Sequence, residues 1–150
     1  MSLHIRQVRL DDPLVAPLLA GLTDEYQRRY GANSEMALTA VEQFDPPSGI
    51  FFVLVDGDTT AAGGGYRAHD ENACEVKRMW TSPDYRRRGL ASRVLAALEE
   101  AASEAGYRRL ILETGPRQPE AFAMYETRGY RRVPTFGPYD EGLAFELQLS

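Results

Sequence analysis

The segment from Ala73 to Thr114 constrains the fold more than any other part of this sequence. It has the pattern of a strand at 73–81, an arginine-rich turn, a helix that stops at Gly106, and a compact apolar strand at 109–114. Six residues at helical spacing form one apolar stripe: Ala91, Val94, Leu95, Leu98, Ala102 and Ala105. That stripe must pack on another layer. A strand, a helix and a strand of these lengths predict a right-handed parallel crossover.

The sequence just before this crossover predicts antiparallel pairing. A short buried strand at 50–55 is followed by Asp56-Gly57-Asp58, which is typical of a hairpin turn, and the chain returns through a strand at 59–69. Three glycines at 63–65 weaken the returning strand unless something packs close to its backbone. In the strand at 73–81, alternation puts one set of residues on one face and a second set on the other: Cys74, Val76, Arg78 and Trp80 against Glu75, Lys77, Met79 and Thr81.

The two ends of the chain add helices and further strands. The first helix is expected to follow the cap residue Asp12, with Pro13 as its first residue, to be bent or delayed by Pro17, and to end near Gly31. The remaining elements are helices at 34–44 and 119–128 and strands at 5–10, 130–133 and 143–149. The predicted fold class is therefore α/β, with a mixed, mostly antiparallel sheet and helices on both faces.

Composition and charge exclude several classes of protein. The 150 residues are 43% hydrophobic and 26% charged, which is the balance of a globular protein. The longest apolar run, at 50–55, is far too short to span a membrane, and no signal pattern is visible. A net charge of −5 disfavours nucleic acid as a partner. Neither a membrane nor a nucleic acid is therefore expected as a partner.

Cysteine and histidine are too few to build a disulfide or a metal site. The sequence has one cysteine, Cys74, and two histidines, His4 and His69. A single cysteine cannot form a disulfide within the chain, and these residues lack the spacing of metal ligands. We therefore expect a reducing, cytoplasmic location and no metal. The sequence is compatible with a monomer and with a homodimer.

The turn that opens the central helix breaks the rules of helix initiation. Arg86, Arg87 and Arg88 stand where the helix dipole is already positive, and no favoured cap residue directly precedes the helix. Bare amides, adjacent guanidinium groups and Gly89, which lets a ligand approach the backbone, are together what a phosphate or pyrophosphate requires. The turn is therefore a candidate anion site. The alternative, from charge alone, is a solvated run of arginines.

The motif Arg86-x-x-Gly89-x-Ala91, after a strand that ends Met79-Trp80-Thr81, resembles the acetyl-CoA signature of the GNAT superfamily of N-acetyltransferases. A later segment, Gln118-x-x-Ala121-x-x-x-Tyr125-x-x-x-Gly129-Tyr130, is similar to the rest of that family's cofactor half. The resemblance implies one GNAT-like domain over 1–150, whose central parallel strands splay around the cofactor. It assigns 1–48 to a variable acceptor side, 50–133 to the cofactor-binding core, and 134–150 to a loop and the last strand.

The resemblance also implies how acetyl-CoA binds. Backbone amides from Arg86 to Ala91 would hold its pyrophosphate, and the main chain of Met79 and Thr81 would pair with its pantetheine arm. The cofactor-binding residues implied are Met79, Trp80, Thr81, Arg86, Arg87, Arg88, Gly89, Leu90, Ala91, Gln118 and Tyr125. Gln118 departs from the family, in which many members carry asparagine. In this family the splay often involves a bulge, which the sequence itself does not reveal.

Acetyl transfer to an amine needs a base for the ammonium proton, a donor for the oxyanion, and an acid for the departing thiolate. The resemblance places Tyr125 at the acid position, whereas helical spacing alone makes it a core residue. It places Glu75 where several relatives carry a general base, with Glu113 as the competing base. The alternative for Glu75 is an ordinary surface pair with Lys77 or Arg78. The Met79 amide is the implied oxyanion donor.

Residues from the variable parts of the chain are candidates for the acceptor cleft. They are Tyr26, Tyr30 and Phe44 from the first helices, and Phe136, Tyr139, Asp140 and Glu141 from the loop before the last strand. The alternative is a solvated loop with incidental packing. Glu113, at the end of the strand at 109–114, is a further candidate for substrate binding. The predicted function is direct transfer of an acetyl group from acetyl-CoA, in a ternary complex, to a primary amine of a small molecule or peptide. One alternative is a non-catalytic acyl-CoA-binding or regulatory module, which would have no use for Tyr125. Another is an RNA-binding protein, which the net charge of −5 disfavours.

Overall fold

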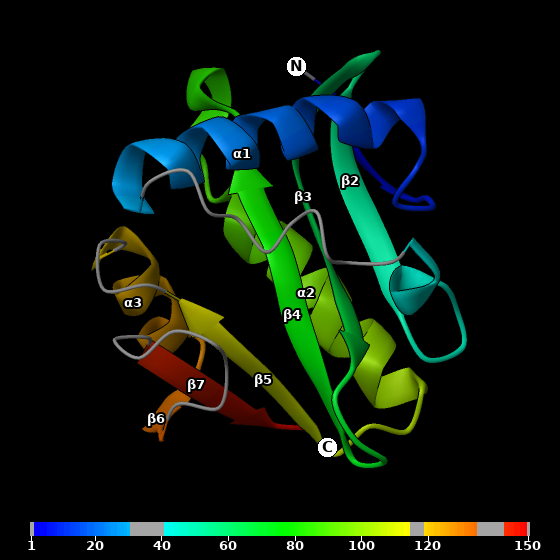
Figure 1. Ribbon diagram of the computed structural model, residues 1–150, viewed down its shortest axis with the longest axis vertical. Helices are drawn as coiled ribbons and strands as arrows, with labels where there is room; N and C mark the ends of the chain where they lie inside the picture. The colour runs from blue at the N-terminus through cyan, green and yellow to red at the C-terminus, as the bar shows by residue number, and fades with distance from the viewer. Residues whose placement is uncertain (1, 31–40, 115–118, 135–142, 150) are drawn as a thin grey trace.

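The computed structural model describes residues 2–30, 41–114, 119–134 and 143–149 (Figure 1). Its strands are β1 (Leu3–Gln7), β2 (Ile50–Asp56), β3 (Thr59–Ala68), β4 (Ala73–Thr81), β5 (Arg109–Thr114), β6 (Arg131–Val133) and β7 (Leu143–Gln148). Its helices are α1 (Ala16–Tyr30), α2 (Leu90–Glu104) and α3 (Pro119–Thr127), with short 3-10 turns η1 (Pro13–Val15), η3 (Val41–Phe44) and η4 (Pro83–Tyr85). None of the helices within these ranges has the length and apolarity needed to cross a membrane.

The strands form one sheet in the order β1-β2-β3-β4-β5-β7-β6. Strands β4 and β5 are parallel, and α2 connects them, whereas the other neighbours in the sheet are antiparallel. The predicted fold class, a mixed and mostly antiparallel sheet with one parallel crossover, is confirmed. Figure 1 shows α1 crossing one face of β2–β4 and α2 lying on the other face.

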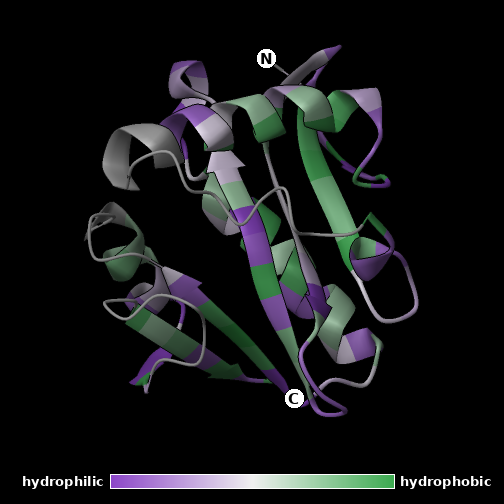
Figure 2. Ribbon diagram, in the orientation of Figure 1, coloured by the Kyte–Doolittle hydropathy of each residue, from purple (hydrophilic) through white to green (hydrophobic). Residues whose placement is uncertain are grey.

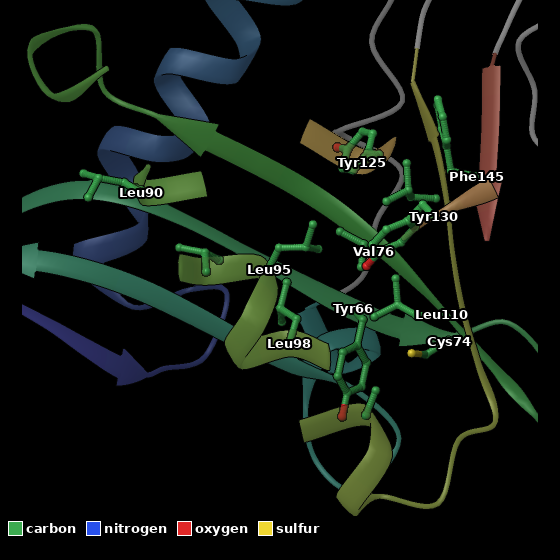
Figure 3. Close-up of a cluster of buried hydrophobic side chains, with 14 of the residues drawn as sticks. Tyr66, Cys74, Val76, Leu90, Leu95, Leu98, Leu110, Tyr125, Tyr130 and Phe145 are labelled. Atoms are coloured by element: carbon green, nitrogen blue, oxygen red, sulfur yellow. The ribbon is translucent and has the colours of Figure 1, made fainter. Parts of the chain in front are cut away.

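The core consists of two clusters, one on each face of the sheet. The α2-side cluster contains Leu54, Ala61, Ala62, Tyr66, Cys74, Val76, Leu90, Val94, Leu95, Leu98, Ala102, Leu110, Leu112, Tyr125, Tyr130 and Phe145 (Figure 3). The α1-side cluster contains Leu10, Val15, Leu18, Leu22, Phe44, Phe51, Val53, Val55 and Trp80. The predicted stripe of α2 supplies much of the first cluster, although Ala91 is only partly buried and Ala105 is exposed. Burial of apolar surface on both faces fixes the sheet between its helices.

Asp12, Pro13 and Pro17 determine where the first helical elements begin. Asp12 accepts a hydrogen bond from the Leu14 amide at 2.8 Å, but the turn that it caps is η1, and the α-helix begins only at Ala16. Pro17 thus lies in the first helical turn, where a missing N–H costs nothing. The predicted delay of the helix is confirmed. The first strand occupies 3–7 rather than the predicted 5–10, because its register against β2 begins at the pair of Leu3 and Asp56.

The glycines at 63–65 allow close packing on β3, as their position in a strand predicted. A Cβ atom added to Gly63 would lie 2.7 Å from Leu18 Cδ1, and one added to Gly65 would lie 2.6 Å from the Ile50 carbonyl oxygen. A Cβ at Gly64 would collide with the Met79 sulfur. Side chains here would push α1 away from the sheet and displace the Met79 side chain of β4.

Gly21 brings α1 equally close to β4, and its replacement should destabilise the protein. A Cβ at Gly21 would lie 2.7 Å from Trp80 Cε2. In an unpacked helix, Gly→Ala gains about 1 kcal/mol of stability. We expect Gly21→Ala to cost about 1–3 kcal/mol instead, because the methyl group overpacks the contact. Urea unfolding measures the difference. In a Trp80→Leu background the same change should lose its penalty, and a stabilising Gly21→Ala in the wild type would contradict this account.

Candidate functional site

Strands β4 and β5 are paired over only part of their lengths. The parallel ladder joins residues 73–75 to 109–111, but β4 continues to Thr81 and β5 to Thr114. Figure 1 shows the two strands separating toward their C-terminal ends, with α1 near the end of β4 and α3 near the end of β5. Figure 2 shows hydrophilic positions in the middle of β4, where the separation begins. An extended polar chain could pair with strand main chain exposed in this way.

A β-bulge interrupts β4 in the same stretch. Gly65 is paired with Lys77 and Gly63 with Trp80, so β4 contains one more residue than β3 between these pairs. The extra residue is accommodated at Arg78, whose φ is 65° and whose side chain is buried. Bulges re-aim side chains and are common next to active sites.

The bulge makes the predicted alternation of β4 wrong beyond Val76. Cys74 and Val76 belong to the α2-side cluster as predicted, but Trp80 lies in the α1-side cluster, on the opposite face. Met79, predicted for the face opposite Cys74, packs against the α2-side cluster. One inserted residue reverses every later side chain, because side chains in a strand have a period of two.

The arginine turn, residues 86–89, follows η4 and leads into α2. The φ angles of Arg87 and Gly89 are 65° and 72°, in the left-handed region that is costly for arginine. The N-cap of α2 has no side-chain hydrogen bond, and an ideal Cβ at Gly89 would meet nothing within 4 Å. The three arginines are exposed. Uncapped amides, open space above Gly89 and guanidinium groups are the donor set that an anionic ligand requires.

Tyr125 occupies a fixed position at the upper end of the α2-side cluster. Its ring is 6% exposed, and its centroid lies 5.3 Å from that of Phe145 and 5.6 Å from that of Tyr130. Figure 3 shows the hydroxyl oxygen on the side of the ring away from Phe145. The packing that helical spacing predicted is therefore present. Packing on two neighbours also fixes where the hydroxyl points, so a core ring can carry a functional group.

An ion-pair network that was not predicted from the sequence ties the segment directly after α3 to α2. Both carboxylate oxygens of Glu99 accept hydrogen bonds from Arg128, and Oε2 also accepts one from the Tyr130 hydroxyl at 2.9 Å. Tyr130 in turn packs on Tyr125. The network therefore supports the position of Tyr125. The signal in the sequence was an arginine directly before the Gly129-Tyr130 pair.

Glu75 is buried and paired with two cations. One carboxylate oxygen lies 3.3 Å from Arg67 Nε and the other 4.0 Å from Lys77 Nζ, and the residue is 7% exposed. Arg67 also donates to the Gln43 side chain at 2.9 Å. Lys77 was a predicted partner, but Arg67 takes the place proposed for Arg78, because the two stand opposite each other in the β3–β4 register. Each carboxylate oxygen of Glu75 therefore faces a cation.

Glu113, on β5, lies beyond the paired part of β4 and β5, near Glu75 of β4. Glu75 stands beside Ile111 in the parallel ladder, and Glu113 follows two residues later on the same face of β5. Neighbouring Leu110 and Leu112 belong to the α2-side cluster, so Glu113 faces the α1 side of the sheet. Both candidate bases therefore lie on one face of the sheet, and Tyr125 packs with the cluster on the other.

Several residues predicted to bind the cofactor or the acceptor lie outside the described parts of the chain. Gln118 and Tyr139 fall in 115–118 and 135–142, and the side chains of Tyr26 and Tyr30 are likewise not described. Phe44 was predicted to line the acceptor cleft, and this is wrong. It is fully buried in the α1-side cluster, with its ring edge-on to Phe51 at a centroid distance of 5.7 Å.

Comparison with known proteins places this geometry in context. Residues 19–130 match the family model described as "Acetyltransferase (GNAT) family". The uncharacterized N-acetyltransferase YsnE of Bacillus subtilis (strain 168) is 34% identical over 103 residues, which cover 67% of this chain and 68% of the relative. An acetyltransferase from Streptococcus agalactiae has a TM-score of 0.83 at 15% identity, covering 98% of both chains. A GNAT family acetyltransferase from Elizabethkingia anophelis, solved with acetyl-CoA bound, has a TM-score of 0.69 at 15% identity, also covering 98% of both chains.

Proposed function

Because this chain belongs to the acetyltransferase (GNAT) family, we propose that it transfers an acetyl group from acetyl-CoA to a primary amine of a small molecule or peptide. The observation that carries the proposal is the separation of β4 from β5 beyond Glu75, with the arginine turn directly after β4. Together they offer strand main chain for an extended arm and an anion site at its end.

The arginine turn fits the phosphates of acetyl-CoA. A pyrophosphate placed above Gly89 would meet uncapped amides at the N-terminus of α2 and the exposed guanidinium groups of Arg86, Arg87 and Arg88. Arg86 is already oriented, because its Nε lies 3.4 Å from the Thr81 carbonyl oxygen. Such a ligand would also balance three positive charges at the positive end of a helix dipole.

The last residues of β4 fit the pantetheine arm. The main chain of Met79 and Thr81 lies beyond the end of the β4–β5 ladder, so an arm could add to β4 as an extra strand would. The bulge at Arg78 changes the direction of the backbone just before Met79. This supports the Met79 amide as the donor that would stabilise a thioester oxygen as it becomes negative.

The acid and the base are proposed to approach the thioester from opposite faces of the sheet. On the α2 side, the Tyr125 hydroxyl is held by its packed ring and would protonate the departing thiolate. On the α1 side, Glu75 and Glu113 would compete for the ammonium proton of the acceptor. The Glu75 carboxylate is already engaged by Arg67 and Lys77, whereas Glu113 lies nearer the C-terminal end of β5, where the two strands are apart.

The state of Cys74 supports direct transfer rather than an acetyl-cysteine intermediate. It is the sole cysteine of the sequence, and its thiol is fully buried in the α2-side cluster. Burial raises the pKa of this thiol to about 12, so almost none of it is thiolate near pH 7. We therefore propose a ternary complex of enzyme, acetyl-CoA and amine, in a cytoplasmic protein whose first 48 residues bind the acceptor.

The proposal predicts that acetyl-CoA stabilises the folded chain. At a concentration about 100-fold above Kd, a ligand that binds only the folded state contributes about 2.7 kcal/mol. For a chain of 150 residues this should raise Tm by roughly 5 °C or more, which differential scanning fluorimetry measures. Acetate and free pantetheine serve as controls without phosphates. No shift with millimolar acetyl-CoA would overturn the proposal.

Turnover separates the enzyme from a non-catalytic acyl-CoA-binding module. A panel of polyamines, amino acids, aminoglycosides and peptides with free N-termini should include an acceptor that releases CoA thiol, detected with a thiol reagent. The release should depend on both substrates and should rise as more of the amine becomes unprotonated. Stabilisation by acetyl-CoA without release from any amine would favour the binding module.

A further inference from the structure

Contacts between the β2–β3 hairpin and the segment that precedes the arginine turn extend the site beyond the residues that would touch acetyl-CoA. Asp56 is the last residue of β2, and Tyr85 is the last residue of η4. The Tyr85 hydroxyl donates a hydrogen bond to Asp56 Oδ2 at 2.8 Å. The Ser82 amide donates to the Ala61 carbonyl of β3, also at 2.8 Å. The hairpin therefore holds the segment that precedes the turn at two points.

The Tyr85 ring also contacts the turn itself. The Arg88 guanidinium carbon lies 5.4 Å from the centroid of the ring, which is within the range of a cation–π interaction. Tyr85 thus connects the hairpin, through its hydroxyl, to Arg88, through its ring. The hydrogen bond to Asp56 raises the pKa of the Tyr85 phenol, which keeps the proton on the hydroxyl as donor.

We propose that Tyr85 and Asp56 are positioning residues for the cosubstrate: the hairpin fixes the Tyr85 ring, and the ring holds Arg88 beside the N-terminus of α2 before the phosphates arrive. This inference rests on the proposed function, because it requires acetyl-CoA phosphates at 86–91. Its physical basis is preorganisation. An arginine side chain that must be immobilised on binding loses rotamer freedom, and an arginine already stacked on a fixed ring has less freedom to lose.

The test uses variants that separate the hydrogen bond from the ring. Tyr85→Phe keeps the ring and removes the hydroxyl, and Asp56→Ala removes the acceptor. Each should raise the Kd for CoA, measured by calorimetry, by roughly 3- to 10-fold, the range of one net hydrogen bond. The Kd for inorganic pyrophosphate should rise by a similar factor. Asp56→Asn keeps an acceptor oxygen of the same shape, and so should restore affinity close to that of the wild type.

The double variant decides whether the two residues act together. If Asp56 acts only through Tyr85, Tyr85→Phe with Asp56→Ala should bind CoA no more weakly than either single variant. Folded single variants that bind CoA as tightly as the wild type, or additive losses, would overturn the inference. So would a loss of stability with unchanged affinity for CoA and pyrophosphate. Failure of the proposed function looks different, because the wild type itself would then bind neither CoA nor acetyl-CoA.

Discussion

Replacing Gly89 with aspartate should weaken CoA binding by roughly 10- to 1,000-fold, whereas asparagine at the same position should bind far better. The two side chains have nearly the same shape, so their difference isolates one negative charge. That charge would stand where the pyrophosphate is proposed to approach the first amides of α2. Asparagine and aspartate also enter the left-handed region more readily than other residues, which suits the φ of 72° at Gly89.

Stability and binding should respond in opposite directions in this pair. A Cβ at Gly89 meets nothing within 4 Å, so both variants should fold. Without ligand, aspartate should be at least as stable as asparagine, because a negative charge near a helix N-terminus is favourable. Calorimetry with CoA and thermal unfolding of the apo protein measure the two effects. Equal affinity of the two variants for CoA would place the phosphates away from Gly89.

The sequence could predict those helices, strands and turns whose signal lies within one short stretch of residues. The α2 stripe repeats at helical spacing, and Asp56-Gly57-Asp58 carries its turn chemistry within three residues. The crossover then followed from length and handedness rules rather than from any single residue. These predictions needed no knowledge of which segments meet across the sheet.

The bulge in β4 could not be predicted, because no residue type encodes it. Arginine at 78 has a positive φ, which its residue type disfavours, so the bulge follows from the pairing of β4 with β3 and not from a residue that prefers this conformation. The cross-strand pair of Arg67 and Glu75 depends on the same pairing. The bulge and the Arg67–Glu75 pair both shape the candidate site, and both depend on the register between β3 and β4. Burial of Phe44 was missed for a related reason, since its partner Phe51 lies on another element.

For Tyr125, helical spacing and the family resemblance predict different roles, and the two roles are compatible. Helical spacing predicted a core residue, and the ring is buried against Phe145 and Tyr130. The proposed acid role concerns only the hydroxyl at the end of that ring. Removal of the oxygen alone therefore separates the two, because phenylalanine keeps the packed ring.

Tyr125→Phe should leave acetyl-CoA binding nearly unchanged and lower kcat by roughly 10²–10⁴-fold, the usual contribution of positioned proton transfer. The ring contacts with Phe145 and Tyr130 should survive, so Tm should change little beyond the loss of one hydroxyl. Steady-state kinetics with the acceptor found in the amine panel measure kcat, and calorimetry measures the Kd of acetyl-CoA. A fall in binding together with kcat would indicate a displaced α3 rather than a lost acid.

The pH profile separates a lost acid from a lost base. Glu75→Gln and Glu113→Gln each remove one candidate base, and the variant that lacks the true base should recover part of its rate at high pH, where more amine is already unprotonated. Tyr125→Phe should show no such recovery, because the thiolate still leaves without a proton. If Tyr125→Phe keeps nearly full kcat from about pH 6 to 9, the range in which amines and thiols begin to titrate, then Tyr125 only packs and water protonates the thiolate.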